Sequence, residues 1–80
     1  MATIVINKAH ADRHYADKSE LLAAAEHAIH RAITRDADFY AAPGPRFPRR
    51  LIVQGSTIEF RAYVREDGTV HVGTHFPIDP

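Results

Sequence analysis

The fold of this 80-residue chain is decided by residues 57–76, which read TIEFRAYVREDGTVHVGTHF. Apolar and polar residues alternate on both sides of the EDG triplet, a pattern typical of two β-strands joined by a tight turn. A three-residue loop with Gly68 in the left-handed conformation pairs Tyr63 with His71 and keeps the two apolar faces together. The stretch therefore predicts a hairpin over 57–65 and 69–76 with one apolar and one polar face. The same register pairs Arg65 with Thr69, Arg61 with Gly73, and Glu59 with His75.

Upstream of the hairpin, residues 19–34 carry the strongest helical pattern in the chain. Asp17 or Ser19 offers an N-cap at the start of this segment. His27 and His30 fall opposite the apolar stripe, so we expect both of them to face water. The stripe itself consists of Leu21, Leu22, Ala25, Ala28, Ile29, Ala32 and Ile33.

Two further short segments are β-prone, residues 3–6 and residues 51–54. Gly55-Ser56 is expected to form the turn that joins 51–54 to the hairpin. We therefore predict an α+β fold with one domain over residues 1–80. In it, an N-terminal helical part packs on one face of a three- to four-stranded antiparallel sheet.

The segment 35–50 is predicted to be an irregular loop. Its run Pro43-Gly44-Pro45-Arg46-Phe47-Pro48 disfavours regular structure, because proline lacks a backbone donor and fixes its own backbone angle. Long loops in small domains are often functional. We expect Phe39, Tyr40 and Phe47 to anchor this loop to the core.

Composition excludes several classes of protein. The chain has no cysteine, so neither disulfides nor a thiolate metal site can stabilise it. No apolar run reaches the roughly 18 residues of a membrane span, and the N-terminus lacks the features of a signal peptide. We therefore expect no membrane partner and a cytoplasmic protein, or one delivered into a target cell. The formal net charge of zero argues against undirected nucleic-acid binding, but late arginines leave room for a local basic patch.

The predicted polar face collects Glu59, Arg61, Tyr63, His71 and His75 around Gly73. Histidine can transfer a proton near neutral pH, and arginine can bind a phosphate through two parallel hydrogen bonds. These are the parts of a metal-independent phosphodiesterase. The alternative is an open sheet face that is polar only because it meets water.

Two histidine pairs have spacings compatible with metal binding. His10 and His14 stand four residues apart, and His71 and His75 would share one strand face. Neither pair has a set of carboxylates or thiolates beside it, so we expect no metal and no cofactor.

Two stretches together resemble the barnase–EndoU–colicin–RelE-like (BECR) ribonuclease toxin domains. The first is residues 58–78, in which Thr74-His75-Phe76-Pro77 is similar to the end of the last strand in that family. The second is His10-Ala11-Asp12-Arg13-His14, ahead of the helix. The resemblance implies a metal-independent endoribonuclease toxin that leaves a 2′,3′-cyclic phosphate, with RNA (tRNA or mRNA) as substrate. It also implies a neutralising antitoxin or immunity protein.

Carried onto this sequence, the resemblance makes His10 or His14 the general acid or base, lets Arg13 bind the phosphate, and gives Thr74 a bond to a phosphate oxygen. Phe76 stands where some members have tyrosine, so it cannot exchange a proton. In the predicted register Thr74 falls on the apolar face, so either a bulge turns it outward or its role is structural. His75 completes the expected catalytic set, and the expected substrate-binding residues are Arg49, Arg50, Arg61, Tyr63 and His71.

A second reading belongs to another class of protein. The chain would then be a non-catalytic binding module, such as an antitoxin, an immunity protein or an inactive relative, that uses the polar sheet face. The two readings differ in geometry, because catalysis requires His10 or His14 to converge with Arg13, Arg61 and His75 on one site of phosphate size.

Overall fold

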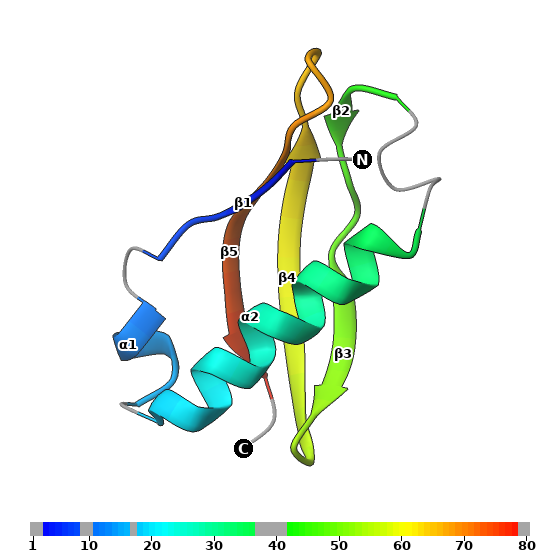
Figure 1. The fold of residues 1–80 in the computed structure, drawn as a ribbon. Helices are drawn as coiled ribbons and strands as arrows, with labels where there is room; N and C mark the ends of the chain where they lie inside the picture. The colour runs from blue at the N-terminus through cyan, green and yellow to red at the C-terminus, as the bar shows by residue number, and fades with distance from the viewer. Residues whose placement is uncertain (1–2, 9–10, 17, 37–41, 79–80) are drawn as a thin grey trace.

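The computed structural model describes residues 3–8, 11–16, 18–36 and 42–78. One long helix lies across a twisted sheet (Figure 1). The elements in chain order are β1 (Ile4–Ile6), α1 (Ala11–His14), α2 (Ser19–Thr34), β2 (Gly44–Pro45), β3 (Arg49–Val53), β4 (Ser56–Val64) and β5 (Val70–Pro77).

The sheet is mixed and has five strands. Its order is β1-β5-β4-β2, and β3 pairs with β4 beside β2. β1 runs parallel to β5, whereas every other pair is antiparallel. The predicted α+β class is confirmed, but the prediction of a purely antiparallel sheet was wrong. Alternation along one strand does not reveal which distant strand will pair with it, or in which direction.

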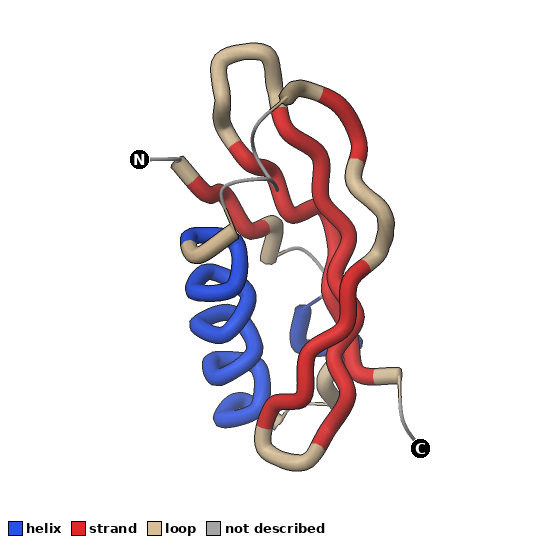
Figure 2. The backbone as a smooth tube through the Cα atoms, turned by 90° about the vertical axis from the view of Figure 1, so that its right-hand side faces the viewer, coloured by secondary structure: helices blue, strands red, loops and turns tan. Residues whose placement is uncertain are grey.

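Helix α2 covers one face of the sheet (Figure 2). The helix has the predicted bounds, and Leu21, Ala25, Ile29 and Ile33 are its buried residues. This spacing of four residues places all four on one stripe against the strands. His27 and His30 are exposed, as predicted. The N-cap is Lys18, which makes no side-chain cap, in place of the predicted Ser19; Asp17 lies outside the described residues. The strands contribute Val53, Ile58, Phe60, Ala62, Val64, Val70 and Val72 to the core.

A β-bulge divides the β4–β5 hairpin into two registers. Near the turn the predicted pairing is confirmed, with Tyr63 opposite His71 and Gly68 at a φ of 91°. The register then shifts between Arg61 and Ala62, and Gly73 becomes the extra residue on β5. Beyond that point Arg61 pairs with Thr74 and not with Gly73. Because one extra residue reverses the alternation, every later side chain of β5 changes face.

The turn before β4 and the loop before β3 also differ from the predictions. The turn residues are Gln54 and Gly55, both with positive φ, so Ser56 already belongs to β4. Phe47 is 92% exposed and does not anchor the loop to the core. Gly44-Pro45 pairs with β4, so the proline-rich segment is not wholly irregular. Phe39 and Tyr40 lie outside the described residues.

Phe60 is 1% exposed at the centre of the core. Replacing it with alanine (Phe60→Ala) should lower the free energy of unfolding by about 3–5 kcal/mol, because a large cavity remains. Denaturant titration measures this change. The matched control is Phe47→Ala, which removes an exposed ring and should change stability by about 0.5 kcal/mol or less. Similar losses in both variants would contradict the assigned core.

Candidate functional site

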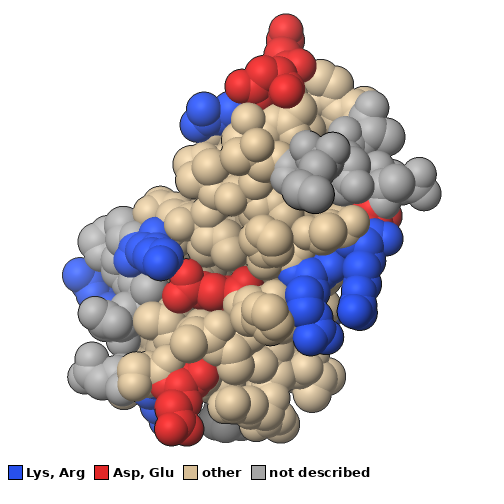
Figure 3. Space-filling model, in the orientation of Figure 1, with Lys and Arg blue, Asp and Glu red and all other residues tan. Residues whose placement is uncertain are grey.

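The candidate site lies on the outer face, which we define as the sheet face opposite α2. Alternation places Glu59, Arg61 and Tyr63 of β4 on this face, together with Arg50 of β3. The bulge adds Thr74 and Phe76 of β5, which pair with Arg61 and Glu59 respectively. Figure 3 shows the opposite, helix-covered side, where acidic and basic side chains form separate small groups.

Two arginines hold one carboxylate at the centre of the outer face. Arg50 Nε donates to Glu59 Oε1 at 3.3 Å, and Arg61 donates to Oε2 through Nε at 3.2 Å and through its terminal nitrogen at 3.1 Å. The Glu59 side chain is only 9% exposed, whereas those of Arg50 and Arg61 are 66% and 59% exposed. The carboxylate therefore fixes the inner N–H groups of both guanidiniums, and their remaining donors face solvent.

The Phe76 ring, on the outer face, contacts the side chain of His14. Its ring centroid lies 5.9 Å from that of His14, and the guanidinium carbon of Arg61 lies 5.7 Å from the same centroid. His14 belongs to α1, which packs beside β5. The outer face therefore combines a proton-transfer group, two outward-facing cations and an aromatic ring.

His75 lies on the inner face, and its predicted place on the polar face was wrong. It pairs with Phe60 in place of Glu59 and is 2% exposed. The Tyr15 hydroxyl lies 2.5 Å from its Nδ1, and Tyr15 is itself buried. His75 Nε2 is buried without a hydrogen-bond partner among the described residues. The bulge is the physical reason, because it turns position 75 inward.

Burial governs the acid–base properties of this buried pair. Burial lowers the pKa of His75 below the ordinary value of 6.5. The negative charge of Glu26 acts against this decrease, whereas the charge of His14 acts in the same direction as burial. Burial also raises the pKa of Tyr15 far above its ordinary value, and Glu26 acts in the same direction. Both groups therefore stay neutral at physiological pH, and the pair fastens the end of α1 to β5.

The other predicted substrate-binding residues divide between the two sides of the sheet. Tyr63 and His71 stack on the outer face with centroids 5.2 Å apart, and Arg65 lies 6.0 Å from the Tyr63 ring. Arg49 instead alternates to the helix side, where it binds Asp36 at 2.5 Å. Arg49 therefore lies on the opposite face of the sheet from Arg50 and Arg61.

The two remaining catalytic candidates precede α2. His10 lies outside the described residues. Arg13 is exposed in the last turn of α1. His14 and Arg61 lie 5.9 Å and 5.7 Å from the Phe76 ring centroid, whereas His75 is buried on the other face, so the predicted four-residue convergence is not found.

Metal binding by His71 and His75 together is excluded by the bulge, which places the two rings on opposite faces of the sheet. Across the described ranges, no three histidine or acidic side chains cluster in a way that could hold a metal ion. None of the described helices is long and apolar enough to cross a membrane.

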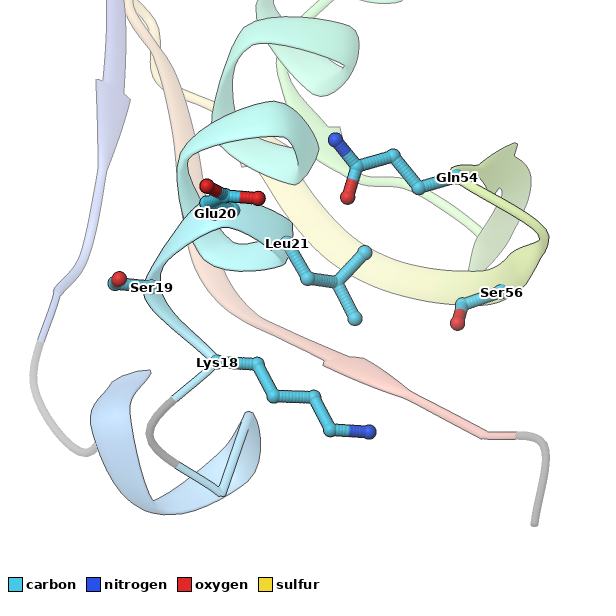
Figure 4. Close-up of a pocket in the computed structure, with 6 residues that line it drawn as sticks. All are labelled: Lys18, Ser19, Glu20, Leu21, Gln54 and Ser56. Atoms are coloured by element: carbon cyan, nitrogen blue, oxygen red, sulfur yellow. The ribbon is translucent and has the colours of Figure 1, made fainter.

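A cavity of about 540 Å³ lies away from the outer face, between the start of α2 and the β3–β4 turn. Figure 4 shows Lys18 and Leu21 pointing across it toward Ser56. Its described lining residues include none of the predicted site residues, and the charged side chains among them are Lys18 and Glu20.

Three important residues were missed by the sequence reasoning. Glu59 was placed on the polar face, but its role as a carboxylate shared by Arg50 and Arg61 was not foreseen. The contact of Phe76 with His14 and the pairing of Tyr15 with His75 were not predicted either. The i, i+2 spacing of Glu59 and Arg61 was the available signal, because such residues share a strand face.

The lowered pKa of His75 predicts how stability depends on pH. As the pH falls through about 6.5, the unfolded chain binds a proton at His75 before the folded chain does, so the free energy of unfolding decreases. In an NMR titration of the imidazole resonances, we expect His75 to titrate below pH 6.5. Titration of His75 at or above that pH would contradict its burial.

The chain was also compared with known proteins. No protein family matches it, and neither curated proteins nor solved structures give a match.

Proposed function

We propose that this chain is a metal-independent endoribonuclease of the toxin type that acts through its outer face. The observation that carries the proposal is the set Arg50–Glu59–Arg61, which lies beside His14 and Phe76. The resemblance of residues 58–78 to BECR ribonucleases points to the same reaction.

The two guanidiniums supply the phosphate site. With Glu59 they carry a net charge of +1, and the buried carboxylate holds them side by side with unused N–H groups facing solvent. Guanidiniums of fixed orientation bind phosphate oxygens in pairs and lose little side-chain entropy on binding. The same groups stabilise the additional negative charge that develops on phosphorus during transfer.

His14 supplies proton transfer. The 2′-hydroxyl attacks the adjacent phosphorus, a general base takes its proton, and the bond to the 5′-oxygen breaks as a general acid protonates that oxygen. The products are a 2′,3′-cyclic phosphate and a 5′-hydroxyl. His14 performs one of these two steps, and His10 is the proposed partner for the other. The Thr74 hydroxyl, opposite Arg61, donates to a non-bridging phosphate oxygen.

The substrate is single-stranded RNA. Phe76 and the Tyr63–His71 pair present aromatic rings on the outer face, interleaved with Arg61 and Arg65. Aromatic rings between cations favour unpaired bases, whose faces are free to stack. His75 and Arg49 take no part in the proposed site, because one is buried and the other is bound to Asp36. An antitoxin or immunity protein that covers the outer face would block cleavage.

A second candidate is a non-catalytic binding module. It is favoured by the environment of Glu59, since both carboxylate oxygens already accept hydrogen bonds from arginine. His14 is then the one described group of the cluster that is placed for proton transfer. Such a module would bind a partner protein through the outer face and would not cleave RNA.

The proposed reaction predicts its own products. RNA incubated with the purified chain should yield fragments that end in 2′,3′-cyclic phosphate, and deoxyribose at the cut site should prevent cleavage. The replacement His14→Ala should lower the rate by about 10²–10⁴-fold, because a positioned acid or base is lost. Gel analysis and mass spectrometry of the fragments measure both effects.

His27→Ala is the matched control, because His27 is an exposed histidine on α2. It should cleave at the rate of the unaltered chain. An RNA digest with the purified chain that shows no cleavage would favour the binding module. Equal losses in the His14 and His27 variants would show that the active face is misplaced.

Metal independence makes a separate prediction. Because arginines and not a metal ion neutralise the phosphate in this proposal, cleavage should continue at an unchanged rate in excess chelator. The rate is measured with and without chelator and again after zinc is added. Loss in chelator with recovery in zinc would replace the histidine mechanism with a metal-activated water.

A further inference from the structure

The β3 strand presents an open edge. Within the described chain β3 pairs only with β4. Ile78 N donates to Thr57 O, so in the part of β4 before the bulge the backbone groups of odd-numbered residues point toward β5. Arg46 N donates to Ala62 O, so the backbone groups of even-numbered residues point toward β2 and β3. Residues 49, 51 and 53 of β3, which face those even-numbered residues, therefore bond to β4. The backbone groups of Arg50 and Ile52 point away from the sheet.

Apolar side chains stand on this open edge. Phe47 and Ile52 are 92% and 74% exposed, the two highest values among the exposed large apolar residues that the structure describes. Next to Ile52 a cavity of about 250 Å³ lies between α2 and β3, lined by Ala28, Arg31, Ala32, Arg35, Leu51 and Ile52. A strand laid along β3 would bury Ile52 and place alternate side chains into this cavity.

The charged side chains among the described residues that line this cavity are positive. Arg31 and Arg35 line the cavity one helical turn apart, and neither forms an ion pair with a described acidic residue. Figure 3 shows basic side chains gathered beside the C-terminal half of α2. A second copy of this chain would place the same arginines against each other, which opposes self-pairing.

We propose that the β3 edge is a docking site for an extended acidic segment of a partner protein, which adds a strand to the sheet. The backbone of the segment pairs with Arg50 and Ile52. Its apolar side chains cover Ile52 on the outer face, and its carboxylates, which alternate with them, enter the cavity on the helix side and meet Arg31 and Arg35. The site is distinct from the proposed phosphate site and does not depend on ribonuclease activity.

Two short synthetic peptides test the proposal, one alternating glutamate with valine and the other alternating lysine with valine. In ¹H–¹⁵N NMR spectra of the full chain, the glutamate peptide should shift the amides of Arg50 and Ile52 and slow their exchange with solvent. The lysine peptide should not. Equal effects of both peptides, or shifts confined to β1 or the outer face, would overturn the proposal.

Two variants locate the contact. Ile52→Pro removes an N–H that β4 does not use and should weaken binding of the glutamate peptide about tenfold, whereas Ile52→Thr keeps that N–H and most of the affinity. Arg31→Glu combined with Arg35→Glu should transfer the preference to the lysine peptide. Unchanged preference in this double variant would overturn the charge argument. Concentration-dependent self-association of the peptide-free chain through β3 would identify a second copy as the occupant.

Discussion

The bulge at Gly73 is the constraint on which the candidate site depends. The Gly73 carbonyl accepts a hydrogen bond from the Asn7 side chain, and the backbone N–H of Asn7 donates to the carbonyl of Val72, the residue before the bulge. These contacts place the bulge where the pairing of β1 with β5 ends. Because the bulge leaves Gly73 unpaired as an extra residue of β5, the side chains of Thr74 and Phe76 lie on the outer face and that of His75 lies in the core. Without the bulge, Phe76 would lie in the core and His14 would lose the ring that it contacts.

A contact on the inner face of the sheet fixes the position of α1 and therefore of His14 on the outer face. Tyr15 and His75 fasten the end of α1 to β5 from inside, while the adjacent His14 meets Phe76 on the outside. A neutral, buried tyrosine–histidine pair is well suited to this role because it requires no charge in the core. The position of the proposed proton-transfer group thus depends on a hydrogen bond that a substrate would not touch.

Although the formal net charge of the chain is zero, arginine side chains gather at two places on its surface. On the outer face Arg50 and Arg61 share one carboxylate, and along the groove between α2 and β3 Arg31 and Arg35 line one cavity. Recognition of an anion depends on the local field and on donor orientation more than on the total charge. A neutral chain can therefore present both the proposed phosphate site and the proposed docking site for an acidic strand.

The sequence by itself determined the features that depend on local periodicity and turn chemistry. These are the bounds of α2, the exposure of His27 and His30, the left-handed Gly68, and the pairing of Tyr63 with His71. Only the tertiary structure decided the parallel pairing of β1, the bulge, the burial of His75 and the sharing of Glu59 between arginines of two strands. Each of these rests on a contact between separate segments of the chain. The bond from Asn7 to Gly73, for example, joins residues 66 positions apart, and no local pattern in either segment encodes it.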